Sequence, residues 1–269
     1  MPKVSVIMGA YNCDSTELRK AIESILNQSF NDFEFVICDD GSNNDTLSVL
    51  KYYENKDSRI KVLVHEKNMG LSIALNNCIE NSVSNYIARM DADDVSHLDR
   101  LEKQYEYMLS NPEVDILGSN INFFDERGIF AKSNLSHIVS KNDFLYNSPL
   151  CHPTIMIKKE VYIKNGCYST NKKVLRCEDY DFFATAFSNG ARIVNFEESL
   201  YDYCENINSF NKRRKYKYRI NEFYVRKKAY KKLKMPFFKR CIYSVKPLII
   251  GLLPSFIYKR IKMKKHRRK

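Results

Sequence analysis

Residues 4–45 of this 269-residue chain read VSVIMGAYNCDSTELRKAIESILNQSFNDFEFVICDDGSNND. A β-branched run over residues 4–8 precedes an acidic, hydroxyl-rich helix start at residues 14–17. Apolar residues then follow at helical spacing, namely Leu18, Ala21, Ile22 and Ile25. A second β-branched run over residues 33–38 ends in an acidic turn. This order predicts a strand, a helix and a second strand, the unit from which parallel sheets are built.

The same alternation continues to about residue 90. We expect helices over residues 47–53 and 71–79, and strands over residues 60–64 and 86–90. Such alternation favours right-handed βαβ units and a parallel sheet with helices on both faces. Polar residues follow each expected strand, at 11–12, 39–42, 65–68 and 91–94. Because ligands of open α/β sheets bind at the carboxyl ends of the strands, we predict one site at one edge.

The second half of the chain alternates less regularly. Apolar spacing predicts helices near residues 98–109, 158–164 and 180–188, and β-branched runs predict strands over residues 115–118, 121–124, 154–157 and 192–194. We interpret this half as a mixed-sheet extension that completes the cleft. From residue 211 we expect a Lys-, Arg- and Tyr-rich helix to about residue 234, followed by a short apolar and basic tail.

The net charge of +12 is concentrated at one end of the chain. Residues 211–269 hold 23 of the 44 Lys and Arg and a single acid, Glu222, whereas residues 1–210 carry a net −10. A basic tail of this kind predicts contact with a polyanion. Its apolar run is interrupted by charges, Pro247 and Pro254, so it is too short to span a bilayer, and we expect it to lie in an anionic membrane surface.

Two other interpretations of the tail remain. It is either solvated, with its apolar part packed on the body, or it binds nucleic acid through Lys212–Arg219. No nucleic-acid-binding motif accompanies that segment, so we expect no nucleic-acid partner. The eight cysteines form no Cys-x-x-Cys pair, and no secretory leader opens the chain. We therefore expect no zinc site, reduced thiols, and a cytoplasmic location, peripheral on the inner face of the membrane.

Two acidic segments are candidates for ligand binding. Asp91-Ala92-Asp93-Asp94 places hard oxygen ligands at a strand end, which suits Mg²⁺ or Mn²⁺ bridging the phosphates of a nucleotide. The alternative is a solvated turn with a helix N-cap at Asp94 or Ser96. In Asp39-Asp40-Gly41-Ser42 a carboxylate has the chemistry to accept the imide N–H of uracil, with Tyr11 stacking on the base, although the segment is also a common turn sequence.

Taken together, these segments resemble a known family. The resemblance is carried by Val4–Ile7 with Tyr11-Asn12, by Ser24–Ser29, Asp39–Ser42, Asn68–Leu71 and Asp91–Asp94, and by Glu178-Asp179. In this order and spacing the chain closely resembles glycosyltransferase family 2, the inverting transferases with a nucleotide-binding A-type fold. It looks most like bacterial exopolysaccharide and capsule transferases. The match is dense over residues 3 to about 110 and looser to about 220.

The resemblance implies a Rossmann-like α/β nucleotide-binding fold with a mixed central sheet, a UDP-sugar donor, and Mn²⁺ or Mg²⁺. Position by position, it implies that Tyr11 lies against the base, Asp40 contacts the uracil, Asp91 faces the ribose and Asp93 holds the metal at the diphosphate. The remaining positions of the implied nucleotide site are Ala10, Arg89 and Ala92. One departure is Gly9-Ala10, where the family often has Pro-Thr, and this weakens the assignment of the nucleotide.

Asp179 is the general base that the resemblance implies. Inversion at an anomeric carbon needs one base for the acceptor hydroxyl and a separate centre for the leaving diphosphate, so two acidic centres are required. The alternative is that Glu178-Asp179 only favours the N-terminus of the following helix through its dipole. Glu178 and His152 are weaker candidates for acceptor contacts, and a lone histidine is more often structural. Arg89 is either a diphosphate contact or a partner that screens the carboxylates.

We therefore expect a metal-dependent, inverting hexosyltransferase that uses a saccharide acceptor, plausibly lipid-linked, in surface polysaccharide synthesis. Residues 1–210 would form the catalytic domain, with a nucleotide-binding half over 1–110 and an acceptor-binding half over 111–210. Residues 211–269 would form a helical, basic, membrane-associating extension. Two alternatives are a non-catalytic member of a polysaccharide assembly complex and a nucleotidyltransferase, although the latter usually needs a Gly-rich phosphate loop.

Overall fold

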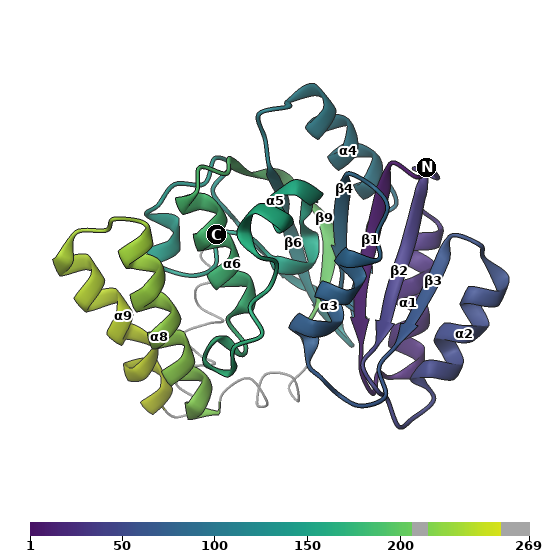
Figure 1. The fold of residues 1–269 in the computed structure, drawn as a ribbon, viewed down its shortest axis with the longest axis horizontal. Coiled ribbons are helices and arrows are strands. Elements are labelled where there is room, and N and C mark those ends of the chain that lie inside the picture. The colour runs from purple at the N-terminus through teal and green to yellow at the C-terminus, as the bar shows by residue number, and fades with distance from the viewer. Residues whose placement is uncertain (206–214, 254–269) are drawn as a thin grey trace.

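The computed structural model describes residues 1–205 and 215–253, and its body is one mixed sheet with helices on both faces (Figure 1). The elements of its first half are β1 (Val4–Ala10), α1 (Ser15–Leu26), β2 (Phe33–Asp39), α2 (Thr46–Lys56), β3 (Ile60–Val64), α3 (Leu71–Glu80) and β4 (Tyr86–Met90). The strands β3, β2, β1 and β4 are neighbours in that order, and all three pairings are parallel. The predicted βαβ alternation is therefore confirmed.

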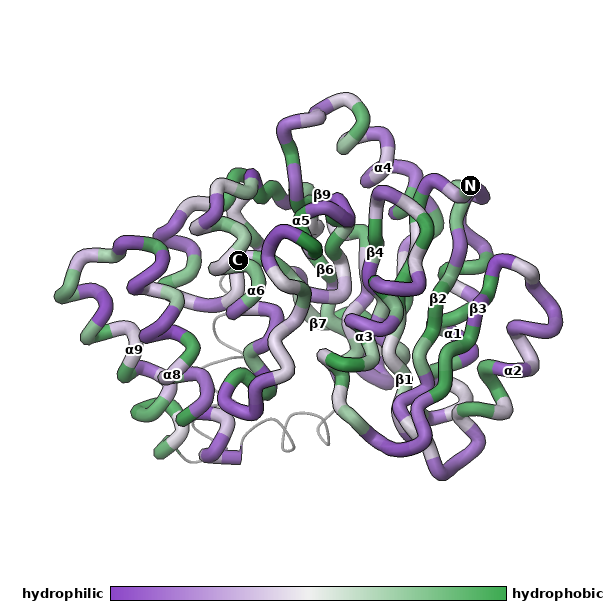
Figure 2. The backbone as a smooth tube through the Cα atoms, in the orientation of Figure 1, coloured by the Kyte–Doolittle hydropathy of each residue, from purple (hydrophilic) through white to green (hydrophobic). Residues whose placement is uncertain are grey.

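The residues of β1 alternate between the two faces of the sheet. Val6 and Met8 join the apolar cluster beneath α1 and α2, whereas Ile7 joins the cluster beneath α3. Because successive side chains of a strand point to opposite faces, a continuous apolar run supplies both cores. Figure 2 shows the hydrophobic colour concentrated along these central strands. The first helix begins as predicted, with the Asp14 carboxylate accepting hydrogen bonds from the backbone N–H groups of Thr16 and Glu17.

The second half adds strands of both directions to the same sheet. Its elements are β5 (Val95–Ser96), α4 (Arg100–Ser110), β6 (Ile116–Asp125), β7 (Gly128–Lys132), β8 (Met156–Lys158), α5 (Lys159–Asn165), α6 (Glu178–Ser188) and β9 (Ile193–Cys204), with short 3-10 turns at Asp143–Leu145, His152–Thr154 and Lys172–Val174. β8 is antiparallel to both β4 and β6, whereas β6 and β9 are parallel. The predicted mixed sheet is confirmed.

Several predicted strand boundaries in this half are wrong. Residues 115–118 and 121–124 belong to one strand, β6, and not to two. The polar pair Ser119-Asn120 resembles a turn in the sequence, but the Asn120 side chain donates to the carbonyls of Phe196 and Glu197 and stays within the sheet. β9 continues to Cys204 and not to residue 194, and β8 begins at Met156 because residues 152–154 form a 3-10 turn.

The chain ends in an antiparallel pair of helices at the edge of the molecule, with α8 (Tyr216–Lys232) packed on α6 and α9 (Phe237–Leu252) outside it (Figure 1). The predicted break at Pro247 is wrong, because Pro247 lies inside α9 and is buried. The helix packs closely on α8 near its end: at Gly251 a Cβ would lie only 2.9 Å from Arg219 Cγ. Pro254 and the basic residues after it lie outside the described residues.

A membrane-spanning helix was not expected in this chain. None of the helices within residues 1–205 and 215–253 is long and apolar enough to cross a bilayer.

Gly41 is required where the β2 turn meets the loop after β3. Its φ is +71°, and a Cβ there would lie 2.4 Å from the backbone carbon of Lys67. We expect Gly41→Ala to lower the free energy of unfolding by roughly 3 kcal/mol, since left-handed strain and a backbone clash add. Gly166 is the matched control, with a φ of +81° and no atom within 4 Å. Gly166→Ala should cost about 1 kcal/mol. Equal costs in urea denaturation would contradict the steric argument.

Candidate functional site

The polar segments that follow β1 and β2 are tied together at the carboxyl edge of the sheet. The backbone N–H of Asn12 donates to Ser42 Oγ at 3.0 Å, and the backbone N–H of Asn43 donates to Asn12 Oδ1 at 2.9 Å. Asn12 adopts a positive φ of 47°, which turns the chain at this point. Tyr11 is left 46% exposed beside this turn, so its ring is available to a ligand.

Asp40 is buried and orders the loop that follows β3. Its Oδ2 accepts from the backbone N–H of Gly70 at 2.7 Å, and its Oδ1 accepts from the backbone N–H of Met69 at 2.9 Å and contacts His65 Nδ1 at 2.8 Å. Thus the carboxylate predicted to contact uracil also fixes the start of α3. Asp39, to which sequence reasoning assigned no role, accepts from the Ser42 N–H through Oδ2 at 3.2 Å; its Oδ1 is buried without a hydrogen-bond partner among the described residues.

The acidic segment after β4 brings three carboxylates together. Asp91, Asp93 and Asp94 each offer an oxygen atom, and these atoms lie within 4.8 Å of one another. β9 holds this segment in place: Asp94 Oδ1 accepts from the Cys204 N–H at 2.7 Å, and the Asp91 N–H donates to the Tyr201 hydroxyl at 3.1 Å. The alternative of an N-cap at Asp94 or Ser96 is wrong, because residues 95–96 form β5 and α4 begins only at Arg100.

The carboxylate cluster fits a divalent cation such as Mn²⁺ or Mg²⁺. Burial, and then the charges of Asp91 and Asp93, raise the pKa of Asp94 well above its ordinary value. Asp94 Oδ2 is buried and has no hydrogen-bond partner of normal geometry within residues 1–205 and 215–253. Three hard oxygen donors close together are the set that such cations prefer. Sequence reasoning assigned the metal to Asp93 alone; the folded loop adds Asp91 and Asp94.

Arg89 is buried at the end of β4 and pairs with Asp91. Its Nη1 donates to Asp91 Oδ2 at 3.2 Å, and its Nη2 donates to Asp91 Oδ1. Burial works to lower the pKa of Arg89, but the charge of Asp91, with smaller contributions from Tyr168, Tyr201 and Asp179, raises it. The pairing is the screening contact that was one of the two alternatives for this residue, and it partly neutralises the acidic segment.

Asp179 lies in the first turn of α6. Its charge and those of the acidic segment act on the same buried thiol, Cys151: burial raises the pKa of Cys151, the charges of Asp94, Asp91 and Asp179 raise it further, and Arg89 opposes them. Burial, and then the charge of Glu178, raise the pKa of Asp179 to about 6, against a lowering by the Tyr180 N–H and Arg89. Asp179 nevertheless keeps partial solvent exposure, as a base must. The fold therefore unites two acidic centres that are about 85 residues apart in the sequence.

A cavity of about 230 Å³ opens beside Asp179, between the start of α6 and α8. Ser148 and Arg176 line it from the body, and Glu222 and Arg226 line it from α8. The Ser148 hydroxyl is buried without a hydrogen-bond partner among the described residues, and Arg226 is held by Glu222 at 3.0 Å and by the carbonyls of residues 144–146. The involvement of α8 was not foreseen from the sequence.

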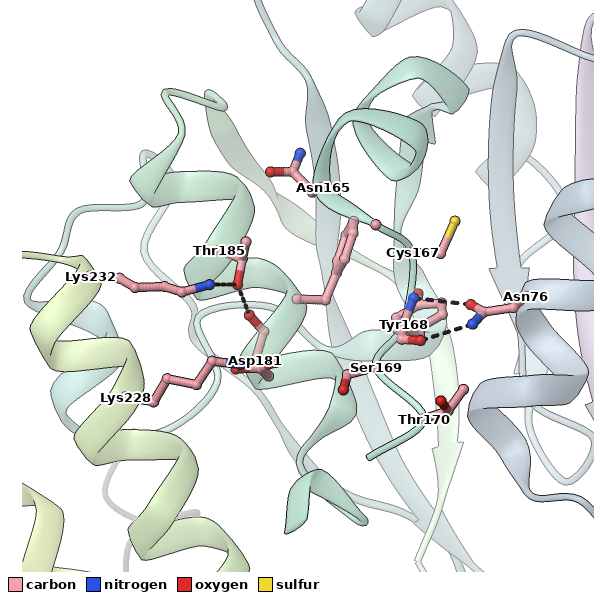
Figure 3. Close-up of a pocket in the computed structure, with 12 residues that line it drawn as sticks. Asn76, Asn165, Cys167, Tyr168, Ser169, Thr170, Asp181, Thr185, Lys228 and Lys232 are labelled. Atoms are coloured by element: carbon pink, nitrogen blue, oxygen red, sulfur yellow. Dashed lines mark hydrogen bonds and ion pairs between the residues drawn. The ribbon is translucent and has the colours of Figure 1, made fainter. Parts of the chain in front are cut away.

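A second, larger hollow of about 420 Å³ lies between α3, α6 and α8 (Figure 3). Lys228 and Lys232 reach from α8 to Asp181 and Thr185 of α6, at 3.0 Å and 2.8 Å (Figure 3). None of the predicted site residues lines this hollow, and its polar groups largely satisfy one another. Of the two hollows, only the smaller is lined by a predicted site residue, Asp179.

The two weaker acceptor candidates have different surroundings. His152 Nε2 contacts the Tyr168 hydroxyl at 2.7 Å, and its ring packs edge-on against Phe183. Burial, together with the charge of Arg89, lowers the pKa of His152 well below its ordinary value, so the ring is neutral. Glu178 is buried, and its Oε2 has no hydrogen-bond partner in the described part of the chain. Neither residue lines the cavity beside Asp179, and their acceptor roles stay predictions.

Comparison of the sequence with known proteins finds one family. The profile of "Glycosyl transferase family 2" matches residues 5–178. EpsE of Bacillus subtilis, which carries a glycosyltransferase name, is 36% identical over 98% of this chain and 94% of its own. The O-antigen biosynthesis glycosyltransferase WbnJ of Escherichia coli is 35% identical over 74% and 78%. An Escherichia coli UDP-Gal:α-D-GlcNAc-diphosphoundecaprenol β-1,3-galactosyltransferase is 28% identical over 97% and 96%.

Solved structures share the fold at low sequence identity. TarS residues 1–349 of S. aureus, in complex with UDP-GlcNAc, aligns with a TM-score of 0.68 and 19% identity over 91% of this chain and 70% of that one. The mannosyltransferase PcManGT of Pyrobaculum calidifontis, in complex with GDP-Man and Mn²⁺, aligns with a TM-score of 0.68 and 16% identity over 93% and 68%. This likeness confirms the predicted A-type nucleotide-binding fold.

The raised pKa of Asp179 has a consequence for stability. Its ordinary value is 3.8 and its value in the fold is about 6. Between about pH 4 and pH 6 the folded state therefore keeps a proton on Asp179 that the unfolded state has lost. The free energy of unfolding falls as the pH rises through this range. At pH 8 we expect Asp179→Asn to raise the free energy of unfolding by about 1–2 kcal/mol, because it removes a buried charge.

The measurement is urea denaturation of both proteins at pH 8 and at pH 4. The gain from Asp179→Asn should largely disappear at pH 4, where the wild-type carboxyl is already protonated. An equal gain at both pH values would show that the substitution acts through packing and not through charge.

Proposed function

The chain belongs to glycosyltransferase family 2, a family of inverting transferases, and from this premise we propose that it transfers a sugar from a UDP-sugar to a saccharide acceptor. Its relatives include enzymes named for bacterial surface polysaccharide synthesis. One observation carries the proposal: the carboxylates of the acidic segment and of Asp179 act electrostatically on the same buried residues, Arg89 and Cys151, so the two acidic centres are neighbours in the fold. A non-catalytic role would not require a base with a raised pKa in that position.

The donor would occupy the carboxyl edge of β1, β2 and β4. Tyr11 would stack on the base and Asp40 would contact it, with the backbone of Ala10 beside them. Asp91 and Ala92 would lie at the ribose, and Asp93 would be the main metal ligand, supported by Asp91 and Asp94. A bound Mn²⁺ or Mg²⁺ would neutralise the departing diphosphate. The complex of TarS with UDP-GlcNAc supports a uridine nucleotide, and that of PcManGT supports Mn²⁺.

Asp179 would act as the general base on the acceptor side. The acceptor oxygen forms a new bond to the anomeric carbon, the bond from that carbon to the diphosphate breaks, and the hydroxyl proton passes to the Asp179 carboxylate. Attack on the face opposite the diphosphate inverts the anomeric centre. A pKa of about 6 suits this role, since the group is ionised at neutral pH and more basic than an ordinary aspartate. The cavity lined by Ser148 and Glu222 would hold the acceptor, with His152 and Glu178 behind it.

We propose further that the acceptor is a lipid-linked saccharide at the cytoplasmic face of the membrane, and that the transferred sugar is a hexose. The Escherichia coli relative named for a diphosphoundecaprenol substrate supports this assignment. In this proposal residues 1–210 form the catalytic domain, with its nucleotide-binding half over 1–110 and its acceptor-binding half over 111–210. Residues 211–269 form the basic extension that meets an anionic membrane surface.

Substitution of the two acidic centres tests their separate roles. In wild type we expect Mn²⁺ and UDP-sugar together to raise the melting temperature. Asp93→Asn should abolish the Mn²⁺-dependent part of that rise. Asp179→Asn should keep the rise but lower the rate of transfer at least about 100-fold. The matched control is Asp99→Asn, which removes an exposed carboxylate paired with Lys103 and should change neither quantity.

The proposal fails if no UDP-sugar is bound or hydrolysed with Mn²⁺ or Mg²⁺ in wild type. It also fails in its assignment of the base if Asp179→Asn transfers sugar at the wild-type rate. A panel of UDP-sugars, screened by melting temperature, identifies the donor.

The dependence of the rate on pH follows from the same carboxylate. Asp179 must be ionised to accept the proton, and its pKa in the fold is about 6. We therefore expect kcat/KM to be flat above pH 7 and to fall about tenfold per pH unit below pH 6. The profile should be measured at saturating Mn²⁺ with a coupled assay for UDP release. If kcat/KM began to fall only near pH 4, Asp179 would not be the base that titrates in the profile.

A further inference from the structure

The outermost helix, α9, exposes large apolar side chains in a single row. These are Phe238, Ile242, Val245, Ile249 and Leu252, and they are between 40% and 76% exposed. At about 100° per residue, they fall within an arc of about 80° around the helix axis. We call this row the outer stripe of α9. Scattered exposed apolar residues are ordinary, but a continuous row is typical of an interaction surface.

The opposite face of α9 carries the smaller and more polar residues. Ser244 and Pro247 are buried, and Gly251 packs against Tyr216 and Arg219 of α8. A helix on the surface of a water-soluble protein normally has the reverse arrangement, with its apolar face toward the core. At Gly251 the approach to α8 is too close for a larger side chain, while the half-buried Tyr243 packs against Tyr146 of the body. The outer stripe therefore faces away from the rest of residues 1–205 and 215–253, and none of these residues buries it.

The helices that present the stripe are strongly basic. Residues 215–253 contain 12 Lys and Arg and one acid, Glu222. Lys227 and Lys231 are exposed on α8, Lys234 is exposed between the two helices, and Lys239 is exposed on α9. Residues 254–269, which lie outside the described residues, add eight Lys and Arg and no acid to the chain immediately after α9. A partner that covers the stripe must therefore accept positive charge around it.

We propose that the outer stripe of α9 is the surface by which this protein lies on an anionic lipid bilayer, with α9 parallel to the membrane plane. An apolar stripe with basic residues around it is the composition of interfacial helices. A second copy of this chain is a poorer partner, because it would bring equal positive charge to the same surface. The helix inserts its apolar side chains at the level of the head groups and does not cross the membrane.

The position of α9 relates this surface to the cavity beside Asp179. α9 packs on α8, and α8 supplies Glu222 and Arg226 to that cavity. Lys228 of α8 also pairs with Asp181 of α6, the helix that carries Asp179. A bilayer under α9 thus holds the cavity near the lipid surface. The inference deepens the proposed lipid-linked acceptor, but lipid binding is measured without donor or acceptor, so the two proposals fail separately.

Tryptophan fluorescence tests contact with lipid at single positions, because the chain contains no tryptophan. Ile249→Trp places a probe in the outer stripe. Leu109→Trp is the matched control, at a 52% exposed position on α4. With vesicles of phosphatidylglycerol and phosphatidylcholine, we expect the emission of Ile249→Trp to shift to shorter wavelength and to be quenched by brominated lipid. The emission of Leu109→Trp should change in neither way.

Loss of the stripe tests its contribution to binding. We expect Ile242→Ser with Ile249→Ser to weaken sedimentation with these vesicles by about 100-fold, since each apolar side chain contributes about tenfold. The control, Leu109→Ser with Ile163→Ser, removes two exposed apolar side chains elsewhere and should bind like wild type. Pure phosphatidylcholine should bind wild type much more weakly. Circular dichroism and melting temperature establish that each variant is folded.

Three results would overturn the proposal. The first is vesicle binding by the Ile242→Ser, Ile249→Ser variant at the wild-type level. The second is emission from Ile249→Trp that is already at short wavelength without lipid and does not respond to vesicles, which would show that the protein's own chain covers the stripe. The third is a dimer in analytical ultracentrifugation that the double substitution dissociates, with no vesicle binding by wild type.

Discussion

Mutual repulsion among the carboxylates of Asp91, Asp93 and Asp94 is the constraint to which the rest of the body responds. Their carboxyl oxygens lie within 4.8 Å of one another, which is unfavourable in a partly buried site without compensation. Arg89 of the preceding strand supplies a buried positive charge, the Cys204 N–H of β9 donates to Asp94, and the pKa of Asp94 is raised well above its ordinary value. The Tyr201 hydroxyl of β9 accepts from the Asp91 N–H. Because the contacts from β9 come from far away in the sequence, the segment has its shape only in the complete sheet.

The mixed topology of the sheet explains how a second acidic centre reaches the first. β8 pairs with β4 in the antiparallel direction and extends the sheet beyond the parallel half. The turn before β8 contacts β4, and the charge of Asp179 at the start of α6 acts on Cys151 beside that turn. Helix α8 closes the far side of the adjoining cavity. In the proposed function, donor and acceptor chemistry come from different halves of the chain, which one sheet joins.

Much of the parallel half was predictable from the sequence, and the reasons for the errors elsewhere are physical. Alternating runs and helical spacing are local signals, and they located β1, β2, β3 and β4 correctly. The errors arose where a residue's partner is distant. Asn120 is a residue type common in turns, but its side chain donates a hydrogen bond to the neighbouring strand. Pro247 is a residue type that usually ends a helix, but it lies within α9. Asp94 was taken as a possible cap, although its carboxylate accepts from β9.

The sequence by itself determined the family, the parallel nucleotide-binding half and the basic character of the C-terminal end, because repeated local patterns and ordered motifs carry that information. Only the tertiary structure decided which carboxylates meet, that Asp40 fixes the loop before α3, that α8 shares the cavity with Asp179, and which face of α9 is left uncovered. These facts depend on contacts between residues far apart in the chain. A single sequence states which residues are present, but burial and distance exist only once the sheet and its helices have packed.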